Sequence, residues 1–444
     1  MHLLAFCMTE VERRYAELLA EELAGNADVI IRGPAGQGGS SNSQGAQPMA
    51  RRIVHRLSIL PLRLLVQLRR AHRNLAYADA MLDAAAPDAI VLFEDNVEDV
   101  TRILGATATR RGIPYVVLPT TIPNPREPAS VYQHSRAHAI TGLAARHVAR
   151  RWPEWIYELD GRKLLRLPVP AILALKSVRA DIPTPWILNS GQASAICLES
   201  RATQEIYRKL GFEDVQLALT GSPVDDVLYE VHHERVQRRD ALLIGLGLDP
   251  KRPLVLVAFP PNQYAASSAA FEYASFAELV GGWLRALAPL AGAVNIVLRP
   301  HPRLRPEELA SFETAGCRVV THPTEQLVPL ADVYVASISA TIRWALALGI
   351  PVINYDCYRY RYDDYTGAQG MTLVEDQNAF DSTLQRIATD ADFRQTMWER
   401  QAADRDNWGC IDGQFATRFL ALLNSLHGSA HPPKPAATRP QALA

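Results

Sequence analysis

The sequence predicts an α/β protein with two doubly wound, Rossmann-like domains. Its 444 residues correspond to about two or three domains, since a domain holds roughly 100–200 residues. Short apolar runs rich in Val, Ile and Leu alternate with amphipathic segments along most of the chain. This alternation is typical of parallel sheets whose strands are connected by helices. The Pro-containing, charged stretch DPKRP at 249–253 separates two such series.

The composition narrows the class of protein further. Hydrophobic residues make up 48% and charged residues 21%, which is ordinary for a folded globular protein and excludes a mainly disordered chain. With 46 basic and 47 acidic residues the net charge is −1, so nucleic acid is not an expected partner. The five cysteines are scattered without a CxxC pair, which favours a cytoplasmic location over a disulfide framework or a zinc site. Neither a signal peptide nor a membrane-spanning segment is expected.

The first domain is expected to cover residues 1–225. Helices are expected over 9–23 and 101–111, and a long helical stretch is broken near Pro61. Periodicity is weaker over 119–170. Apolar runs bounded by turn residues predict the strands, at 3–6, 29–31, 89–93, 115–118, 196–198 and 216–219.

A linker is expected over 226–253 and a second domain over 254–426. Two helices separated by a polar turn are expected over 377–425, and the tail 427–444 has no apolar period and is expected to be disordered. The predicted strands of this domain are 254–259, 294–298, 318–320, 333–335 and 352–354, with helices over 276–287, 307–315 and 341–348.

Ligands of open parallel sheets bind beyond the carboxyl ends of the strands, so polar residues in the loops there are the candidates for a binding site. The strand 294–298 runs directly into RPHPR, in which two prolines fix the loop. Arg299 offers a forked donor and His301 can donate to a phosphate oxygen, so this loop suits a phosphate or a phosphosugar. The alternative is that His301 only caps the loop.

A second strand end carries three hydroxyl residues, Ser337, Ser339 and Thr341. Hydroxyls and free amides where a helix begins favour an anion, although an ordinary Ser N-cap would explain one of the three. A third strand end carries Asn262, which is expected to touch the sugar or phosphate or else to belong to a plain loop.

These motifs, in this order, resemble a group of GT-B glycosyltransferases with an HP motif and a later serine motif. The group includes bacterial sialyltransferases, capsule-type Kdo transferases and teichoic-acid glycerophosphate polymerases. The resemblance covers residues 195–425 and rests on ESRATQEIYRKLGF and LTGSPVDD (199–226), RPHP (299–302), SISAT (337–341) and ALALGIPVINYD (345–356).

The resemblance implies two Rossmann-like domains that face each other across a cleft. It also implies a glycosyltransferase of bacterial surface polysaccharide that transfers a sugar from a CMP- or CDP-activated donor to a glycan or lipid-linked acceptor. Donor binding would fall to the second domain, with no tightly bound cofactor and no dedicated metal site. The resemblance assigns donor binding to His301, Pro302, Ser337 and Ser339. The residues of the strand ends and of the loop that follows the last of these strands add Arg299, Thr341, Asn262 and Asp356 to the expected donor-binding set, with His301 also catalytic.

Two rival functions remain open. The same layout resembles the non-hydrolysing UDP-GlcNAc 2-epimerases, in which a Ser-Gly-Gly run and then glutamates open the helix after the late strand. This chain has SISAT there, and Arg343 where a carboxylate is expected. The other rival is a non-catalytic, two-lobed sugar-binding protein, which a secretory signal would have favoured.

An acid–base residue is expected in the first domain, where the acceptor would bind. Glu94 and Asp95 directly follow the strand 89–93, and a carboxylate there could take the proton of an acceptor hydroxyl. Both are therefore candidate catalytic residues, unless they only place charge at the start of a helix. His134 and His138, on a possible acceptor loop, are weaker alternatives.

The stretch 50–73 carries seven arginines, and no carboxylate occurs between Asp28 and Asp79. Its apolar residues recur every three or four positions, which predicts a helix with one apolar and one basic face. Such a helix can lie on an anionic membrane, with Arg69, Arg70 and Arg73 facing the membrane or the acceptor. The alternative is a packed helix with a solvated basic face.

Overall fold

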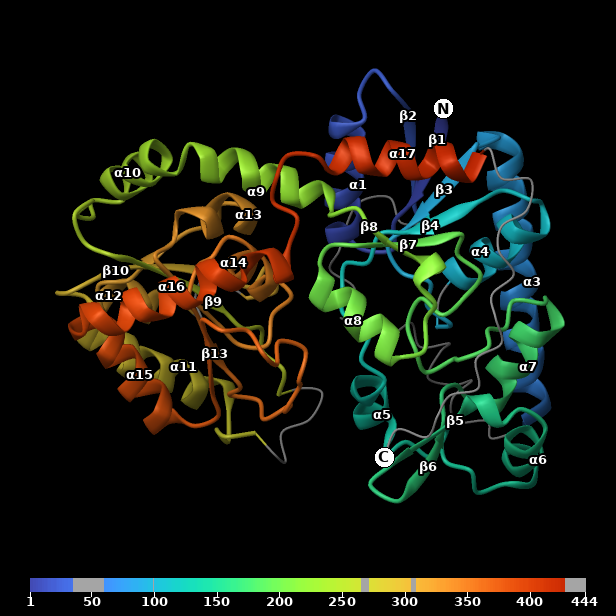
Figure 1. Cartoon of the computed structure of the whole chain (residues 1–444). Coiled ribbons are helices and arrows are strands. Elements are labelled where there is room, and N and C mark those ends of the chain that lie inside the picture. The colour runs from blue at the N-terminus through green and yellow to red at the C-terminus, as the bar shows by residue number, and fades with distance from the viewer. Residues whose placement is uncertain (35–59, 99, 265–270, 305–308, 428–444) are drawn as a thin grey trace. The chain divides into compact units, whose positions relative to one another are not determined.

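The computed structural model describes residues 1–34, 60–98, 100–264, 271–304 and 309–427 (Figure 1). The chain divides into two compact units. The N-terminal unit comprises residues 1–198, 204–220 and 416–444, and the C-terminal unit comprises residues 199–203 and 221–415. Each unit contains a six-stranded parallel sheet with helices, so the predicted α/β class with two Rossmann-like domains is confirmed.

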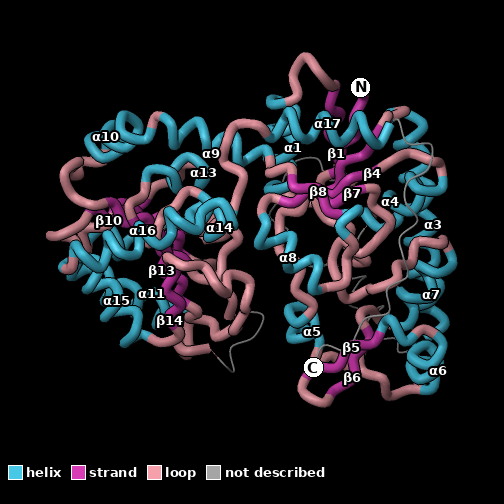
Figure 2. The backbone as a smooth tube through the Cα atoms, viewed as in Figure 1, coloured by secondary structure: helices cyan, strands magenta, loops and turns pink. Residues whose placement is uncertain are grey.

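The sheet of the N-terminal unit has the strand order β2-β1-β3-β4-β7-β8. The chain moves outward in one direction from β1 and in the other from β3, so the order reverses between these two strands. A separate antiparallel hairpin, β5 and β6, lies apart from the sheet (Figure 2). The strand bounds are β1 His2–Phe6, β2 Asp28–Arg32, β3 Ala89–Leu92, β4 Tyr115–Val117, β5 Ile156–Leu159, β6 Arg162–Leu165, β7 Ala195–Leu198 and β8 Leu217–Leu219.

Local signals in the sequence explain where the helices of this unit begin. Thr9 and Glu12 form a capping box at the start of α1, and Pro61 is the second residue of α3, where its missing N–H costs no hydrogen bond. The bounds are α1 Glu10–Glu22, α3 Leu60–Ala85, α4 Thr101–Arg110, α5 Arg126–Tyr132, α6 Leu143–Arg151, α7 Val169–Ser177, α8 Arg201–Lys209 and α17 Phe415–His427.

The sheet of the C-terminal unit has the order β11-β10-β9-β12-β13-β14, in which the direction reverses between β9 and β12. Its core is aromatic, because Phe259 packs edge-on against Trp283 and Phe312. The strand bounds are β9 Leu254–Phe259, β10 Asn295–Pro300, β11 Arg318–Val319, β12 Val333–Ala336, β13 Val352–Tyr355 and β14 Met371–Val374. The helix bounds are α9 Pro223–His233, α10 Arg235–Gly245, α11 Phe276–Leu287, α12 Ala310–Thr314, α13 Thr324–Leu327, α14 Ile342–Ala347, α15 Gln377–Thr389 and α16 Ala391–Trp408.

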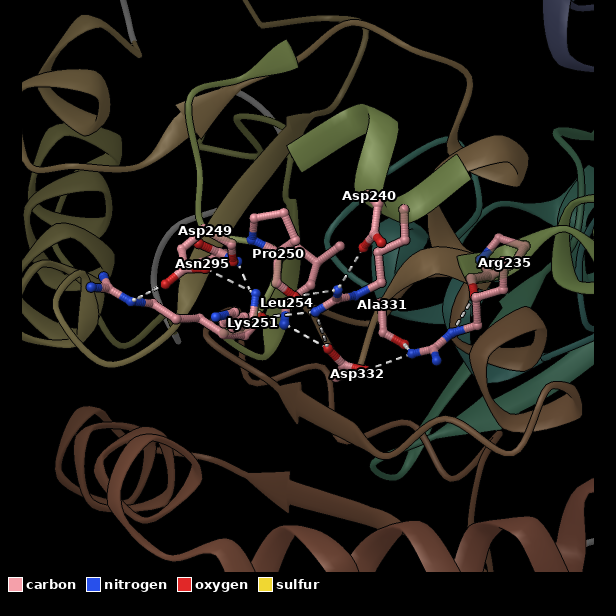
Figure 3. Close-up of polar contacts among 12 residues, drawn as sticks. Arg235, Asp240, Asp249, Pro250, Lys251, Leu254, Asn295, Ala331 and Asp332 are labelled. Atoms are coloured by element: carbon pink, nitrogen blue, oxygen red, sulfur yellow. Dashed lines mark hydrogen bonds and ion pairs between the residues drawn. The ribbon is translucent and has the colours of Figure 1, made fainter. Parts of the chain in front are cut away.

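Asp332 fastens helix α10 to the sheet of the C-terminal unit. Arg235 and Arg239 donate to its carboxylate at 2.5 and 3.0 Å, and the amide of Leu254 donates at 2.7 Å (Figure 3). Arg239 also donates to the carbonyls of Pro250 and Arg252, at 2.8 and 2.7 Å. The segment predicted as a linker, 226–253, is therefore mostly helical and bound to the C-terminal unit.

Two further predictions about the chain's organisation differ from the structure. Residues 377–427 form three helices rather than two, because the chain breaks at Asp390, whose side chain caps α16 by accepting from the amide of Phe393 at 2.9 Å. The predicted polar turn also begins later than expected, since α16 continues to Trp408. Helix α17 belongs to the N-terminal unit, where Arg418 donates to the carbonyl of Thr220 at 2.8 Å and His427 lies 3.6 Å from Asp88. Of the predicted tail, the structure describes only His427.

A buried ion pair lies inside the N-terminal unit, directly after β3. Asp95 and Arg102 are both fully buried, and Arg102 Nη1 donates to Asp95 Oδ2 at 2.5 Å. The hydroxyl of Tyr115 donates to the same oxygen at 2.8 Å. Gly191 passes so close that a Cβ there would lie 1.8 Å from Asp95 Oδ2, so only glycine fits.

We predict that Asp95→Asn strongly destabilises the N-terminal unit, because it leaves the Arg102 guanidinium charged and unpaired in the core. The expected loss is about 3–5 kcal/mol of unfolding free energy, measured by urea denaturation. Asp83→Asn is the matched control, since Asp83 forms an exposed pair with Arg111 at 2.6 Å. Its loss should stay below about 1 kcal/mol, and equal losses for the two variants would contradict the role of the buried pair.

Candidate functional site

The candidate donor site of the C-terminal unit is a set of loops at the carboxyl edge of its sheet. The loops after β9 and β12 flank the point where the strand order reverses, and the loop after β10 lies next to them. Such reversal points are where open α/β sheets bind ligands. Hydrogen bonds connect the loops, since the amide of His301 donates to the carbonyl of Phe259 at 3.1 Å and the hydroxyl of Tyr358 to that of Pro261.

His301 is held as a neutral imidazole. The amide of Arg303 donates to its Nδ1 at 3.2 Å, so Nδ1 is the acceptor and the neutral ring carries its proton on Nε2. Burial, with smaller contributions from the charges of Arg303 and Arg299, lowers the pKa of His301 to about 4. The ring is half-buried, so at neutral pH it offers a ligand an uncharged Nε2–H donor.

Arg299 is partly used within the protein. Its Nε donates to the carbonyl of His322 at 2.8 Å and its Nη1 to that of Pro300, so it joins the loop after β10 to the segment after β11. Burial lowers the pKa of Arg299, and Glu325 opposes that shift. Pro302 is exposed on the same loop. Arg299 therefore shapes the loop that carries His301.

The turn after β12 is strained at Ile338. This β-branched residue has φ +42°, a left-handed conformation that such side chains rarely adopt. The side-chain oxygen of Asn354 accepts a hydrogen bond from its amide at 3.0 Å and helps to hold the turn. Backbone strain of this kind clusters at functional sites, and here it lies between the two serines that the sequence singled out.

The hydroxyls of this turn form two groups. Ser337 is buried, and its Oγ lies 3.2 Å from the Cys357 sulfur. Ser339 Oγ lies 2.8 Å from Thr341 Oγ1, which lies 2.5 Å from the Tyr334 hydroxyl. Helix α14 has only six residues, so its dipole contributes little to the anion site that was expected where the helix begins. Side chains and the strained backbone, rather than a helix dipole, define this loop.

Asp356 is a correction to the predicted donor-binding set. It is buried and accepts hydrogen bonds from the amides of Tyr360 and Arg361, at 2.9 and 2.7 Å. It therefore closes the turn 356–361 instead of facing a ligand. Tyr360, within this turn, stacks on Tyr362, with the two ring centroids 5.2 Å apart.

Asn262 lies exposed on the loop after β9, and its side-chain oxygen accepts from the amide of Tyr264 at 3.1 Å. No acceptor among the described residues takes its side-chain NH₂ group, which is left for a ligand.

Helix α14 carries Arg343, which is buried and pairs with Glu199 at 2.7 Å and with Asp225 at 2.8 Å. Arg343 thus belongs to an internal ion cluster of the C-terminal unit.

In the N-terminal unit, the two candidate bases have different surroundings. Glu94 is partly exposed and accepts from the Thr121 hydroxyl at 2.9 Å. Burial raises the pKa of Glu94, Glu98 raises it further, and hydrogen bonds from Thr121 and Asn96 oppose the shift. Asp95 is enclosed in the ion pair with Arg102, so it is corrected to a structural residue. Adjacent residues at a strand end point to opposite sides, which explains the difference.

Sequence reasoning missed Glu12. It follows β1, which adjoins β3 at the reversal of the N-terminal sheet, and it accepts hydrogen bonds from the amides of Met8 and Thr9. Burial, opposed by the hydrogen bonds from Met8 and Thr9 and supported by the charge of Glu94, raises the pKa of Glu12 to about 7. The Thr-x-x-Glu spacing was the available signal, but it indicates a capping box as readily as a site.

The basic residues predicted to face the acceptor or the membrane lie in two places. Arg69, Arg70 and Arg73 are exposed on α3. His134 is exposed and 3.3 Å from Arg162, whereas His138 is buried. Residues 50–59 of the predicted amphipathic stretch lie outside the described residues.

The described residues lack both a membrane-spanning helix and a metal-binding cluster. None of their helices is long and apolar enough to cross a membrane. No group of three or more His, Cys, Asp or Glu side chains among them is arranged to hold a metal ion.

No family model matches the sequence, and no curated protein matches it. Solved structures do match the fold. UDP-GlcNAc 2-epimerase from Neisseria meningitidis, bound to UDP-GlcNAc, is 11% identical with a TM-score of 0.53, and the match covers 96% of this chain and 100% of that one. A variant of the wall teichoic acid polymerase TagF is also 11% identical with a TM-score of 0.53, over 96% of this chain and 89% of that one.

The glycotransferase of kitacinnamycin is 14% identical with a TM-score of 0.50, over 96% of this chain and 98% of that one. A TagF structure soaked with CDPG matches over 53% of this chain and 57% of that one, with a TM-score of 0.39. At these identities the similarity concerns the fold. The chain has a GT-B-like fold, with two Rossmann-like parallel-sheet units, which it shares with sugar-nucleotide enzymes.

Proposed function

We propose that the protein is a glycosyltransferase of bacterial surface polysaccharide synthesis that uses a CMP- or CDP-activated sugar donor. The carrying observation is the loop after β10, which presents the neutral His301 beside the reversal point of the C-terminal sheet. The strained turn with Ser337 and Ser339 follows β12, which pairs with β9, and lies at the same edge of the sheet. Both motifs also resemble the donor site of the HP-motif glycosyltransferases.

The proposed donor chemistry needs a hydrogen-bond donor directed at the phosphate of the nucleotide sugar. The Nε2–H of His301 donates to a phosphate oxygen and stabilises the negative charge that grows on the leaving nucleotide. Ser339, Thr341 and the Asn262 amide supply further hydrogen bonds. The stacked rings of Tyr360 and Tyr362 offer a flat surface for the base or the sugar.

The proposed acceptor chemistry belongs to Glu94 in the N-terminal unit. Its carboxylate takes the proton of the attacking acceptor hydroxyl as the glycosidic bond forms. A raised pKa suits this role, because a base whose pKa is nearer to neutrality accepts the proton more readily. The negative charge of Glu98 adds to the raised pKa of Glu94.

A second candidate function is a sugar-nucleotide epimerase, because the fold also matches UDP-GlcNAc 2-epimerase over 96% of the chain. An epimerase requires only its nucleotide sugar. Conversion of UDP-GlcNAc without any acceptor, followed by NMR, would favour that function. Against it stands Arg343, which occupies a buried ion cluster where the epimerases are expected to carry a carboxylate.

We predict that CMP or CDP stabilises the protein more than UDP or GDP does in a thermal-shift panel. A ligand at about 100 times its dissociation constant adds roughly 2.7 kcal/mol to the unfolding free energy. His301→Ala should abolish the shift without lowering the melting temperature of the free protein, because the backbone bond to Phe259 remains. His233→Ala, an exposed histidine of the same unit, should keep the wild-type shift. A shift with UDP alone would rule out the cytidine donor.

We predict that Glu94→Gln lowers kcat by about 10²–10⁴-fold with little change in donor affinity, as expected for loss of a general base. The wild-type rate should fall as the pH drops through the raised pKa of Glu94, because only the ionised carboxylate accepts the proton. The control is Glu21→Gln, which removes an exposed charge from α1. Wild-type turnover in Glu94→Gln would move the base elsewhere.

We also propose that helix α3 binds anionic membranes peripherally. Its first two turns expose Leu60, Leu62, Leu65 and Val66, next to the exposed Arg69, Arg70 and Arg73. Leu64 and Leu68 of the same helix are half-buried in the protein. The apolar contact with lipid is therefore assigned to the four exposed residues.

We predict that the protein co-sediments with anionic vesicles at low salt and is partly released at high salt. Each basic residue near an anionic surface contributes about 1 kcal/mol, and salt screens that contribution. Changing Arg69, Arg70 and Arg73 to Glu should abolish the salt-sensitive part. Changing Arg146, Arg150 and Arg151 of α6 to Glu is the matched control in the same unit. No binding by the wild-type protein at low salt would leave α3 as a solvated helix.

A further inference from the structure

A small cavity in the N-terminal unit lies between helices α3 and α7 and the segment after β3. Its volume is about 260 Å³. Sites for drug-sized ligands usually measure about 300–1,000 Å³, so this cavity suits a ligand the size of a single sugar ring. None of the residues on which the donor chemistry rests contributes to its wall.

One wall of the cavity is a polar face of helix α3. Gln67, Arg70 and Asn74 line it, and their spacing of three and four residues places them on one side of the helix. None of the three side chains has a hydrogen-bonding partner among the described residues. The two amides offer both donors and acceptors and the guanidinium offers a fork of donors, which together suit vicinal hydroxyls and an acid group.

A carboxylate that is held in place, that of Glu98, also lines the cavity. The Tyr132 hydroxyl and Arg166 Nη1 both donate to Glu98 Oε1. The described residues place no donor on Glu98 Oε2, which is left to accept from a ligand hydroxyl. Arg166 is almost fully buried, and its Cζ lies 5.7 Å from the ring centroids of Tyr132 and Trp186. Because Arg166 forms an ion pair with Glu98, its positive charge neutralises that of the carboxylate.

His138 completes the polar lining. Its ring stacks on Tyr132 with centroids 4.0 Å apart, and its Nδ1 lies 2.9 Å from the carbonyl oxygen of Leu165. A carbonyl can only accept, so Nδ1 carries the proton. Burial lowers the pKa of His138, which keeps the ring neutral and makes Nε2 an acceptor.

The remaining lining is apolar and comes mainly from Ile103, Ala171 and Leu175. A sugar ring has C–H faces as well as hydroxyl edges, and a mixed wall of this kind matches both. The charges of Glu98 and Arg166 cancel, so Arg70 remains as the net charge of the lining. Residues 60–78 of α3 contain no carboxylate that would offset it.

We propose that this cavity binds one sugar ring that carries a carboxylate or a phosphate, and that this ring is the terminal residue of the acceptor glycan. The identity of this sugar as part of the acceptor rests on the proposed function, whereas the binding of an acidic sugar in the cavity does not. Arg70 recognises the acid group, Glu98 and the two amides recognise hydroxyls, and Ala171 and Leu175 contact a face of the ring.

The test measures binding of three sugars that share a ring, namely D-glucuronate, D-glucose 6-phosphate and D-glucose, by saturation-transfer NMR without any donor. The wild-type protein should bind both anionic sugars at least about tenfold more tightly than glucose, a difference of about 1.4 kcal/mol. Arg70→Gln should remove that preference and keep weak binding of all three. Ala171→Trp should fill the cavity and abolish binding of all three.

Ala76→Trp is the matched control, because Ala76 is exposed on α3 and does not line the cavity. It should bind as the wild-type protein does, and unchanged circular dichroism and melting temperature would show that each variant folds. Equal binding of the sugars in the wild-type protein, undiminished binding in Ala171→Trp, or no saturable binding at millimolar concentrations would each overturn the proposal.

The same set of variants separates this proposal from the proposed function. Ala171→Trp should keep the CMP- or CDP-dependent thermal shift, and His301→Ala should keep the binding of anionic sugars. If the wild-type protein binds the anionic sugars but shows no thermal shift with CMP or CDP, the donor assignment alone is rejected. The reverse result would reject the cavity alone.

Discussion

Every strand of the two six-stranded sheets runs parallel to its neighbours, and this constraint determines where chemistry can occur. Parallel strands end at one common edge, so the loops after them gather there, and the reversal of strand order separates two of those loops. In the C-terminal unit this edge carries His301 and the hydroxyl turn. In the N-terminal unit the equivalent edge carries Glu12 and Glu94. The hydrogen-bonding requirement of the sheet thus positions polar side chains that lie far apart in the sequence.

Much of this arrangement could be predicted from the sequence, because buried parallel strands are short apolar runs. The strand predicted at 254–259 coincides with β9, and the one predicted at 89–93 ends one residue beyond β3. Less was predictable where burial is partial. The strands of the hairpin β5–β6 read IYEL and RKLL, without alternation of apolar and polar residues, and α16 buries few residues, among them Met397, Gln401 and Trp408. Such segments carry little periodic signal, since tertiary contacts rather than pattern determine them.

Within the site, the sequence indicated which loops matter but not which way their side chains point. Glu94 and Asp95 are adjacent acids at one strand end, and only the packing of Arg102 and Tyr115 shows that Asp95 is internal. The carboxylate of Asp356 likewise accepts hydrogen bonds from the backbone of its own turn. The positive φ of Ile338 carries no signal in the residue type, because glycine is the usual marker of that conformation. These features arise from three-dimensional packing, which residue order alone does not specify.

The return of helix α17 to the N-terminal unit has a consequence for how the chain is made. The backbone passes between the units at 198/199, 203/204, 220/221 and 415/416, so no single cut separates them. Phe419 and Leu423 of α17 are buried, and these contacts exist only after the C-terminal unit and α17 behind it have left the ribosome. Domains often fold in order of synthesis, N-terminal first. Here the first unit to emerge is the last to be completed, and until then it exposes an apolar surface to the cell.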